Sequence, residues 1–234
     1  EVDGIFKDGA NQSARTFSEA DVENLPEPVQ RYLKHVLKSG QPYINSVRLK
    51  QTGVMCLAPG QPWKPFTAQQ YFTTNPPAFI WYAKLSFMPL LWVAARDKYA
   101  RQQGNMLIKA LATLTIGNES GSDLSSAAFI RFLAEAMWFP TALIDTPYLQ
   151  WEAINANSAR ALVDDNGVKA ALIFHFDENG DITKVESPDR FKDPADTQPT
   201  PWFGHVQQYR EFDGVRIPSE VEVCWGLETG DFAY

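Results

Sequence analysis

The sequence predicts an α+β fold in which a large curled antiparallel sheet, a half-barrel, holds a buried central helix and follows an N-terminal amphipathic helix. Three observations predict it. Segments of strand length with alternating apolar residues run from Tyr43 towards the C-terminus, and Asn-Gly and Asp-Gly pairs join several of them. One helix-like segment, 123–144, is apolar around most of its circumference. A sheet of about ten or more strands tends to curl, and its concave face must be filled.

The chain is divided into an N-terminal arm, residues 1–20, and a single curled-sheet domain, residues 21–234. The arm is polar and shows no clear period, so we expect little order there. In LPEPVQRYLKHVLKSG, Pro28 suits the first turn of a helix and Gly40 supplies a stop. This segment predicts the amphipathic surface helix.

Strands are expected on both sides of the central helix. Before it they are predicted around residues 47–51 and at 67–73, 78–85, 90–95 and 104–116, the last chosen as a strand over a helix. After it they are predicted at 149–154, 159–164, 168–176, 182–187, 205–212, 215–217 and 219–225. Tight turns are expected at Asn166-Gly167, Asn179-Gly180 and Asp213-Gly214. The irregular segment 188–201 contains four prolines and predicts a flap or a mobile loop.

The central helix is expected to begin with Asp123 as its N-cap and to end before Pro140, which gives a helix at 123–139. Its one polar stripe carries Arg131, Glu135 and Trp138 at i, i+4 and i+7. Two interpretations stay open. An Arg131–Glu135 ion pair closes the open side of a buried helix, or the pair and the indole line a pocket.

The composition excludes several classes of protein. The net charge is −7 and no cluster of Lys and Arg is evident, which argues against a nucleic-acid partner and against anionic membrane surfaces. Cys56 and Cys224 lack metal-type spacing, so we expect no metal and no cofactor; they either pair in an oxidising compartment or remain buried free thiols. The longest apolar run, 87–95, is far below the roughly 20 residues that span a bilayer, so a soluble portion is expected.

The chain resembles a bacterial family of domains of unknown function. The resemblance is carried by LPEPVQRYL at 25–33, WKPFTAQQYF at 63–72, FIW at 79–81, ARDKY at 95–99, RFLAEAMWFPTAL at 131–143, and the PW, Y, G and IP of 201–218. This family is similar in pattern to the LolA-like lipoprotein-carrier superfamily. That similarity implies a half-barrel sheet with helices in its mouth and the binding of acyl chains, and it supplies no catalytic residue.

Aromatic residues are abundant, and they either fill an ordinary core or line an apolar cavity with a few polar anchors. For the second interpretation the candidate ligand-binding residues are Trp81, Trp92, Arg96, Arg131, Glu135, Trp138, Arg190 and Trp202. No G-x-S-x-G elbow is present, and no catalytic residue is assigned.

The expected function is a non-enzymatic binding domain of the bacterial envelope, periplasmic or membrane-anchored, with a cytoplasmic location as the alternative. The expected partner is an apolar or lipid-like small molecule held between the concave sheet and the helix at 123–139. Membrane association, if it occurs, is expected through a segment outside this sequence. One alternative is a hydrolase-type enzyme with Glu135 as acid or base and Arg131 as an anion clamp. An assembly module is a further alternative.

Overall fold

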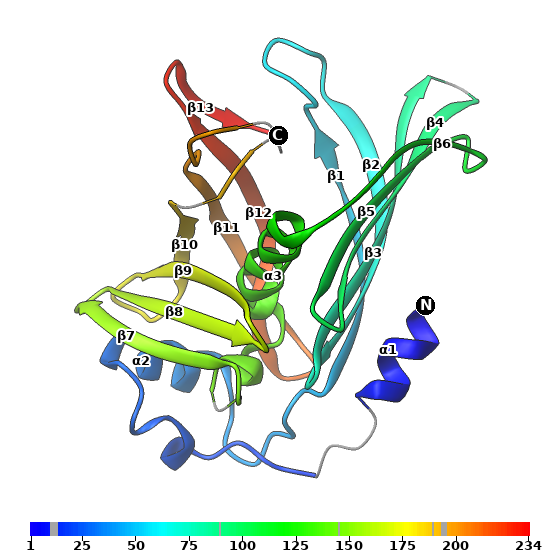
Figure 1. The fold of residues 1–234 in the computed structure, drawn as a ribbon. Helices are drawn as coiled ribbons and strands as arrows, with labels where there is room; N and C mark the ends of the chain where they lie inside the picture. Colours follow the sequence, from blue (N-terminus) through cyan, green and yellow to red (C-terminus); the bar gives the residue numbers. More distant parts are fainter. Residues whose placement is uncertain (10–13, 89, 145, 189, 193–195) are drawn as a thin grey trace. The chain divides into compact units, whose positions relative to one another are not determined.

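The computed structural model describes residues 1–9, 14–88, 90–144, 146–188, 190–192 and 196–234, and it forms two compact units (Figure 1). The first unit contains Glu1–Gln12, Asn45–Phe132 and Tyr234, and the second contains Ser13–Ile44 and Leu133–Ala233. Each unit is built on one antiparallel sheet accompanied by helices, so the predicted α+β class is confirmed. The strands form sheets of six and seven strands, where the sequence predicted one large sheet.

The sheet of the first unit follows the chain strand by strand. Consecutive strands are joined by short connections, so each pairs antiparallel with the next. The strands are β1 (Ser46–Met55), β2 (Lys64–Thr74), β3 (Pro77–Met88), β4 (Leu91–Ala100), β5 (Gln103–Ala110) and β6 (Leu114–Ser120). Because the strand direction alternates, the β1–β2, β3–β4 and β5–β6 connections all lie at the same end of this sheet (Figure 1).

The N-terminal residues contain a helix, α1 (Val2–Asp8), where the sequence predicted an arm with little order. Val2, Ile5 and Phe6 have helical spacing and form one apolar face. Ile5 is buried against Ala78 and Ile80 of β3. Three apolar residues give only a weak periodic signal in a polar stretch. The burial of Ile5 and the packing of the partly buried Phe6 ring on Tyr71 are enough to hold this short helix on the sheet.

The other face of this sheet is covered by α3 (Ser122–Glu135). The ring of Phe129 stacks on Tyr99 with 4.9 Å between centroids, and Phe132 lies 6.3 Å from Phe72. The start of α3 approaches β5 closely, because Gly104 donates its N–H to Ser125 Oγ at 3.0 Å. A Cβ on Gly104 would lie 2.6 Å from the carbonyl oxygen of Leu124, so only glycine fits there.

The predicted bounds of α3 need two corrections. The helix begins at Ser122, and Gly121 accepts the first helical hydrogen bond from the N–H of Ser125, so Asp123 lies in the first turn instead of at the N-cap. The α-helix ends at Glu135, and two 3-10 turns follow, η2 (Ala136–Trp138) and η3 (Pro140–Leu143). The break before Pro140 is confirmed.

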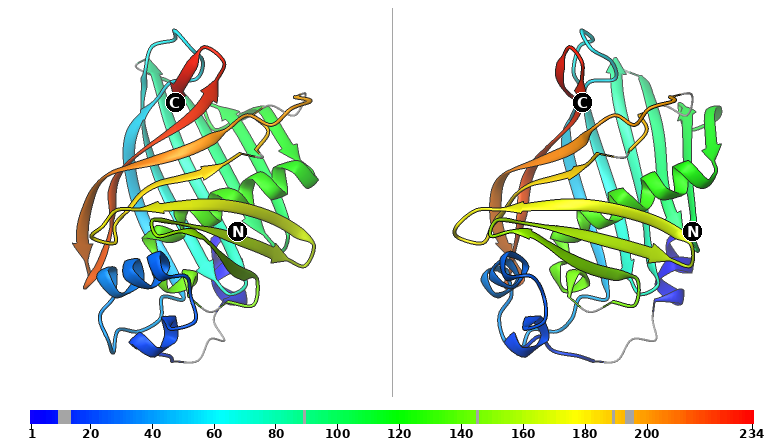
Figure 2. Two further views of the ribbon diagram at one scale, coloured as in Figure 1. Left: turned by 90° about the vertical axis from the view of Figure 1, so that its left-hand side faces the viewer. Right: turned by 60° about the vertical axis from the view of Figure 1, so that its left-hand side comes forward.

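The sheet of the second unit also follows the chain order, coloured yellow-green to red in Figure 2. Its strands are β7 (Leu149–Asn155), β8 (Ser158–Asp165), β9 (Val168–Phe176), β10 (Ile182–Ser187), β11 (Trp202–Phe212), β12 (Val215–Leu227) and β13 (Gly230–Ala233). It is preceded by η1 (Glu19–Val22) and α2 (Glu27–Val36), whose Tyr32 contacts the ring of Phe176. The helix predicted in LPEPVQRYLKHVLKSG is confirmed, although it ends at Val36, before the stop expected at Gly40. Segments 215–217 and 219–225 form one strand.

The segment 104–116 was wrongly predicted as one strand. It is the β5–β6 hairpin, turning at Leu111 and Ala112, which have φ values of 48° and 59°. Turns with positive φ normally contain Gly, Asn or Asp, so an apolar pair gives no sequence signal. The predicted turns at Asn166-Gly167 and Asp213-Gly214 have the expected positive φ at both residues, and Gly180 has it in the third turn.

Three further expectations can be compared with the structure. Cys56 and Cys224 are both free and buried. Within the residues that the structure describes, no helix is long and apolar enough to cross a membrane. The expected flap at 188–201 falls partly on residues 189 and 193–195, which lie outside the described residues.

Candidate ligand-binding site

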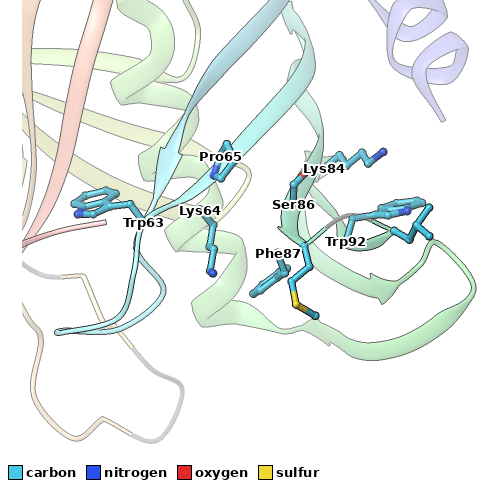
Figure 3. A pocket seen from close by; sticks show the side chains of 9 residues that line it. Trp63, Lys64, Pro65, Lys84, Ser86, Phe87 and Trp92 are labelled. Atoms are coloured by element: carbon cyan, nitrogen blue, oxygen red, sulfur yellow. The ribbon is translucent and has the colours of Figure 1, made fainter.

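A pocket of about 490 Å³ lies at the end of the first sheet where β2, β3 and β4 meet their connections (Figure 3). Its walls combine aromatic rings, aliphatic side chains and two ammonium groups. The residues that line it are Trp63, Lys64, Pro65, Lys84, Ser86, Phe87, Met88, Leu90 and Trp92. Its volume lies within the range of small-molecule sites, and polar and apolar atoms line it in about equal measure.

Strand register brings these residues together. Side chains two apart on a strand share a face, so Lys84 and Ser86 point the same way. Ser86 pairs with Trp92 across β3 and β4, which places the indole beside them. The β1–β2 connection ends at Trp63, so the second indole comes from the neighbouring hairpin.

The two ammonium groups lie over aromatic rings. Lys84 Nζ is 4.7 Å from the ring centre of Trp92, and Lys64 Nζ is 5.7 Å from that of Phe87. Neither lysine forms an ion pair with any residue that the structure describes. The pocket therefore offers positive charge beside apolar surface, which suits a ligand with an anionic head and an apolar tail.

A second group of candidate residues lies on the face of the same sheet that α3 covers, which we call the inner face. Arg131 of α3 donates to Asp97 of β4 at 2.7 Å, and its guanidinium lies 4.8 Å from the ring centre of Trp81. Trp81 Nε1 donates to Gln51 at 2.8 Å. Asp97 is 5% exposed, so this carboxylate and its arginine form a buried ion pair that joins helix to sheet.

The predicted site residues are thus distributed over several places. Trp81 and Arg131 are brought together, and Trp92 lines the pocket. Arg96 points to the outer face, where it binds Glu1 at 2.5 Å and also Asn105. In the second unit, Arg190 lies 4.7 Å from the ring of Trp202, while Glu135 ends α3 and Trp138 ends η2.

Sequence reasoning missed most of the pocket. Trp63, Lys64, Lys84, Phe87, Met88 and Leu90 were not among the candidates. One signal could have found them: residues 28–96 contain no Asp or Glu, although the whole chain carries a net charge of −7. The apolar run at 87–95 was compared only with the length of a membrane span.

Within the described ranges, no group of three or more His, Cys, Asp or Glu side chains could hold a metal ion. Asp177 accepts the N–H groups of Asn179 and Asp181, each at 2.9 Å, as a carboxylate does when it closes a turn.

Comparison with curated proteins finds no match, and neither does comparison with solved structures. The model of one family matches residues 15–234, nearly the whole chain. The similarity to LolA-like carriers has no counterpart in these comparisons. The chain belongs to the family of unknown function DUF6544.

Proposed function

We propose that this protein is a non-enzymatic binding domain for an apolar or lipid-like ligand that has an anionic head. The pocket at the end of the first sheet carries the proposal, because it places Lys64 and Lys84 beside the aromatic rings of Phe87 and Trp92. A carboxylate or phosphate would bind one of the two ammonium groups, which point away from each other in Figure 3, and the apolar tail would lie along the ring beside it, Trp92 for Lys84 or Phe87 for Lys64. Met88 adds a flexible side chain that adapts to tails of different shape.

The inner face of the first sheet is the other place for such a ligand, and it is the one that the sequence predicted. The stacked rings of Phe129 and Tyr99 already occupy this face close to α3. A ligand there would have to displace well-packed aromatic rings, which costs packing energy. This packing favours the pocket over the inner face as the position of the ligand.

We also propose that the fold is LolA-like and that the protein is located in the bacterial envelope. Strands that pair in sequence order, with one helix after the sixth, support a LolA-like relationship. An apolar ligand also agrees with a bacterial envelope location, periplasmic or membrane-anchored. Cell fractionation with an antibody against the protein would test the location.

Titration with dodecanoate, followed by tryptophan fluorescence, tests the binding proposal, with dodecanol as the uncharged probe. We expect dodecanoate to bind more tightly than dodecanol. Lys84→Gln should weaken dodecanoate binding by about tenfold, because a charge-assisted contact is lost, and should leave dodecanol binding unchanged. Lys169→Gln, at an exposed lysine of the second unit, is the matched control.

Three outcomes are informative. If neither probe binds, or if Lys84→Gln binds dodecanoate like the wild type, the proposal is wrong. If Trp81→Phe weakens binding and Trp92→Phe does not, the ligand lies on the inner face. Lipid extraction of the purified protein with mass spectrometry would then identify the natural ligand.

A further inference from the structure

Exposed apolar side chains gather at one end of the first sheet. We call this end the hairpin end; it comprises the described residues of 54–64, 86–92 and 109–114. Eight of the thirteen large exposed apolar residues in the described part of the chain lie there, with exposures from 41% for Leu91 to 95% for Leu90. They are Val54, Leu57, Trp63, Met88, Leu90, Leu91, Leu111 and Leu114. Such a concentration of exposed apolar surface marks an interaction site.

The turns at the hairpin end use residues that disfavour their own backbone conformation. Leu90 has a φ of 68°, Leu111 a φ of 48° and Ala112 a φ of 59°. A residue with a Cβ is strained in this left-handed region, whereas Gly and Asn adopt it easily. These leucines are therefore both strained and exposed, so folding of the chain does not explain them.

The charge at the hairpin end is one-sided. Residues 46–118 contain eight Lys and Arg and a single acid, Asp97, which is buried against Arg131. Arg96 and Lys98 pair with Glu1, just before α1, and Arg101 pairs with Asp8 of α1. Lys64 and Lys109 belong to the hairpin end, and Lys84 lies on β3 two residues before it; none of the three has an ion-pair partner within the described residues.

We infer that the hairpin end docks on the surface of a bilayer that contains anionic lipids. Leucines at the tips of three hairpins enter the apolar boundary of the bilayer. Trp63 and Trp92 sit at the level of the headgroups, where amphipathic rings are favoured. Lys64, Lys84 and Lys109 bind lipid phosphates, and their long side chains allow the ammonium groups to reach them.

The chemistry fits a bilayer better than a protein partner. Protein interfaces are enriched in Arg and depleted in Lys, and all three unpaired cations here are lysines. The apolar residues also project from separate turns, which suits insertion into a fluid layer. The net charge of −7, which argued against anionic membranes, averages over a chain whose first sheet is basic.

This inference goes beyond the proposed function, because it concerns a membrane surface and not a molecule in the pocket. Leu57, Leu111 and Leu114 belong to the hairpin end but line no part of the pocket. Variants at these three positions therefore separate docking from ligand binding.

Sedimentation with lipid vesicles tests the inference. The full chain is mixed with vesicles of phosphatidylcholine and phosphatidylglycerol, or of phosphatidylcholine alone. We expect binding to the anionic vesicles that weakens as salt is added. The triple variant Leu57→Ser, Leu111→Asn, Leu114→Ser should bind about tenfold or more weakly, because three apolar contacts are lost. The double variant Ile154→Ser, Phe212→Ser removes exposed apolar residues of the second unit and should bind like the wild type.

The melting temperature of each variant is measured first, and dodecanoate binding is measured alongside. The inference is overturned if the wild type does not bind anionic vesicles, or if the triple variant binds as tightly as the wild type. It is also overturned if the hairpin end instead holds a second protein chain, seen as a dimer that the triple variant abolishes. Vesicle binding without dodecanoate binding rejects only the proposed function, and the reverse result rejects only the inference.

Discussion

Both sheets contain tight turns with positive φ, but different residues occupy these turns. In the second sheet, the β8–β9 and β11–β12 turns use Asn166-Gly167 and Asp213-Gly214, which adopt positive φ at little cost. In the first sheet, the β3–β4 and β5–β6 turns place Leu90 and Leu111 in the same region. The Asn-Gly and Asp-Gly turns of the second sheet only close their hairpins. The leucine turns of the first sheet keep exposed leucines at a cost in conformational energy.

The second unit and the first sheet also differ in the sign of their charge. The second unit contains twenty-two Asp and Glu against eleven Lys and Arg, whereas residues 46–118 contain one acid against eight bases. An acidic unit with glycine turns is suited to solubility, and a basic sheet with leucine turns is suited to an anionic, apolar partner. The difference favours the hairpin end as the docking surface that we propose, and the overall composition conceals this difference.

The largest expected effect concerns Asp97, a buried acid of the first sheet. Arg131→Met leaves the carboxylate of Asp97 buried without its arginine, and we expect a loss of about 3 kcal/mol. Arg216→Met in the second unit removes a cation that is 37% exposed and should cost less than about 1 kcal/mol. Hydrogen exchange in β4 and in β12 measures the two losses separately. If Arg131→Met together with Asp97→Asn is as unstable as Arg131→Met alone, the buried charge is not the cause.

Exchanging the turn residues between the sheets tests the strain directly. Leu111→Asn with Ala112→Gly should stabilise the protein by about 1 kcal/mol, because the left-handed conformation no longer opposes a side chain. Asn166→Leu with Gly167→Ala should destabilise it by about 1–2 kcal/mol for the same reason. Thermal unfolding of the two variants measures both changes. A lower melting temperature for the first variant would show that its leucine turn stabilises the fold.

The smallest effect is on thiol reactivity in the acidic unit. Burial, together with the nearby carboxylates of Glu222 and Asp231, raises the pKa of Cys224 to about 11. At pH 8 only about one thiol in a thousand is then ionised, so alkylation should be slow and should speed up tenfold per pH unit below pH 11. The rate is measured with iodoacetamide in a Cys56→Ser background. Glu222→Gln should accelerate it, and an unchanged rate would remove that carboxylate as a cause.

Much of the fold could be predicted because it depends on local patterns. Alternation and Asn-Gly or Asp-Gly pairs identified the strands β7 to β11 of the second sheet, and β12 as two segments, while Pro28 with the following apolar stripe identified α2. The β5–β6 hairpin could not be predicted, since Leu111 and Ala112 give no turn signal. The division into two sheets depends on packing between distant segments, which periodicity does not encode.

The candidate site was less predictable than the fold. Trp81 and Arg131 lie together, and a carboxylate beside Arg131 is that of Asp97, thirty-four positions away in sequence. Helical spacing points only to Glu135, and a pair between Arg131 and Glu135 stays a prediction. The pocket forms where the ends of β2, β3 and β4 lie side by side. Predicting it would require the register of all three strands. The absence of acids from 28–96 was visible in the sequence and is the most useful signal to look for.

Hydrogen–deuterium exchange of the full chain, with and without anionic vesicles, tests most directly whether the hairpin end is the binding surface. Peptides covering 54–64, 86–92 and 109–116 should be protected by vesicles that contain phosphatidylglycerol. Peptides covering the Asn166-Gly167 and Asp213-Gly214 turns should exchange at unchanged rates. Protection of the acidic turns, or no protection at the three hairpins of the first sheet, would contradict the assignment.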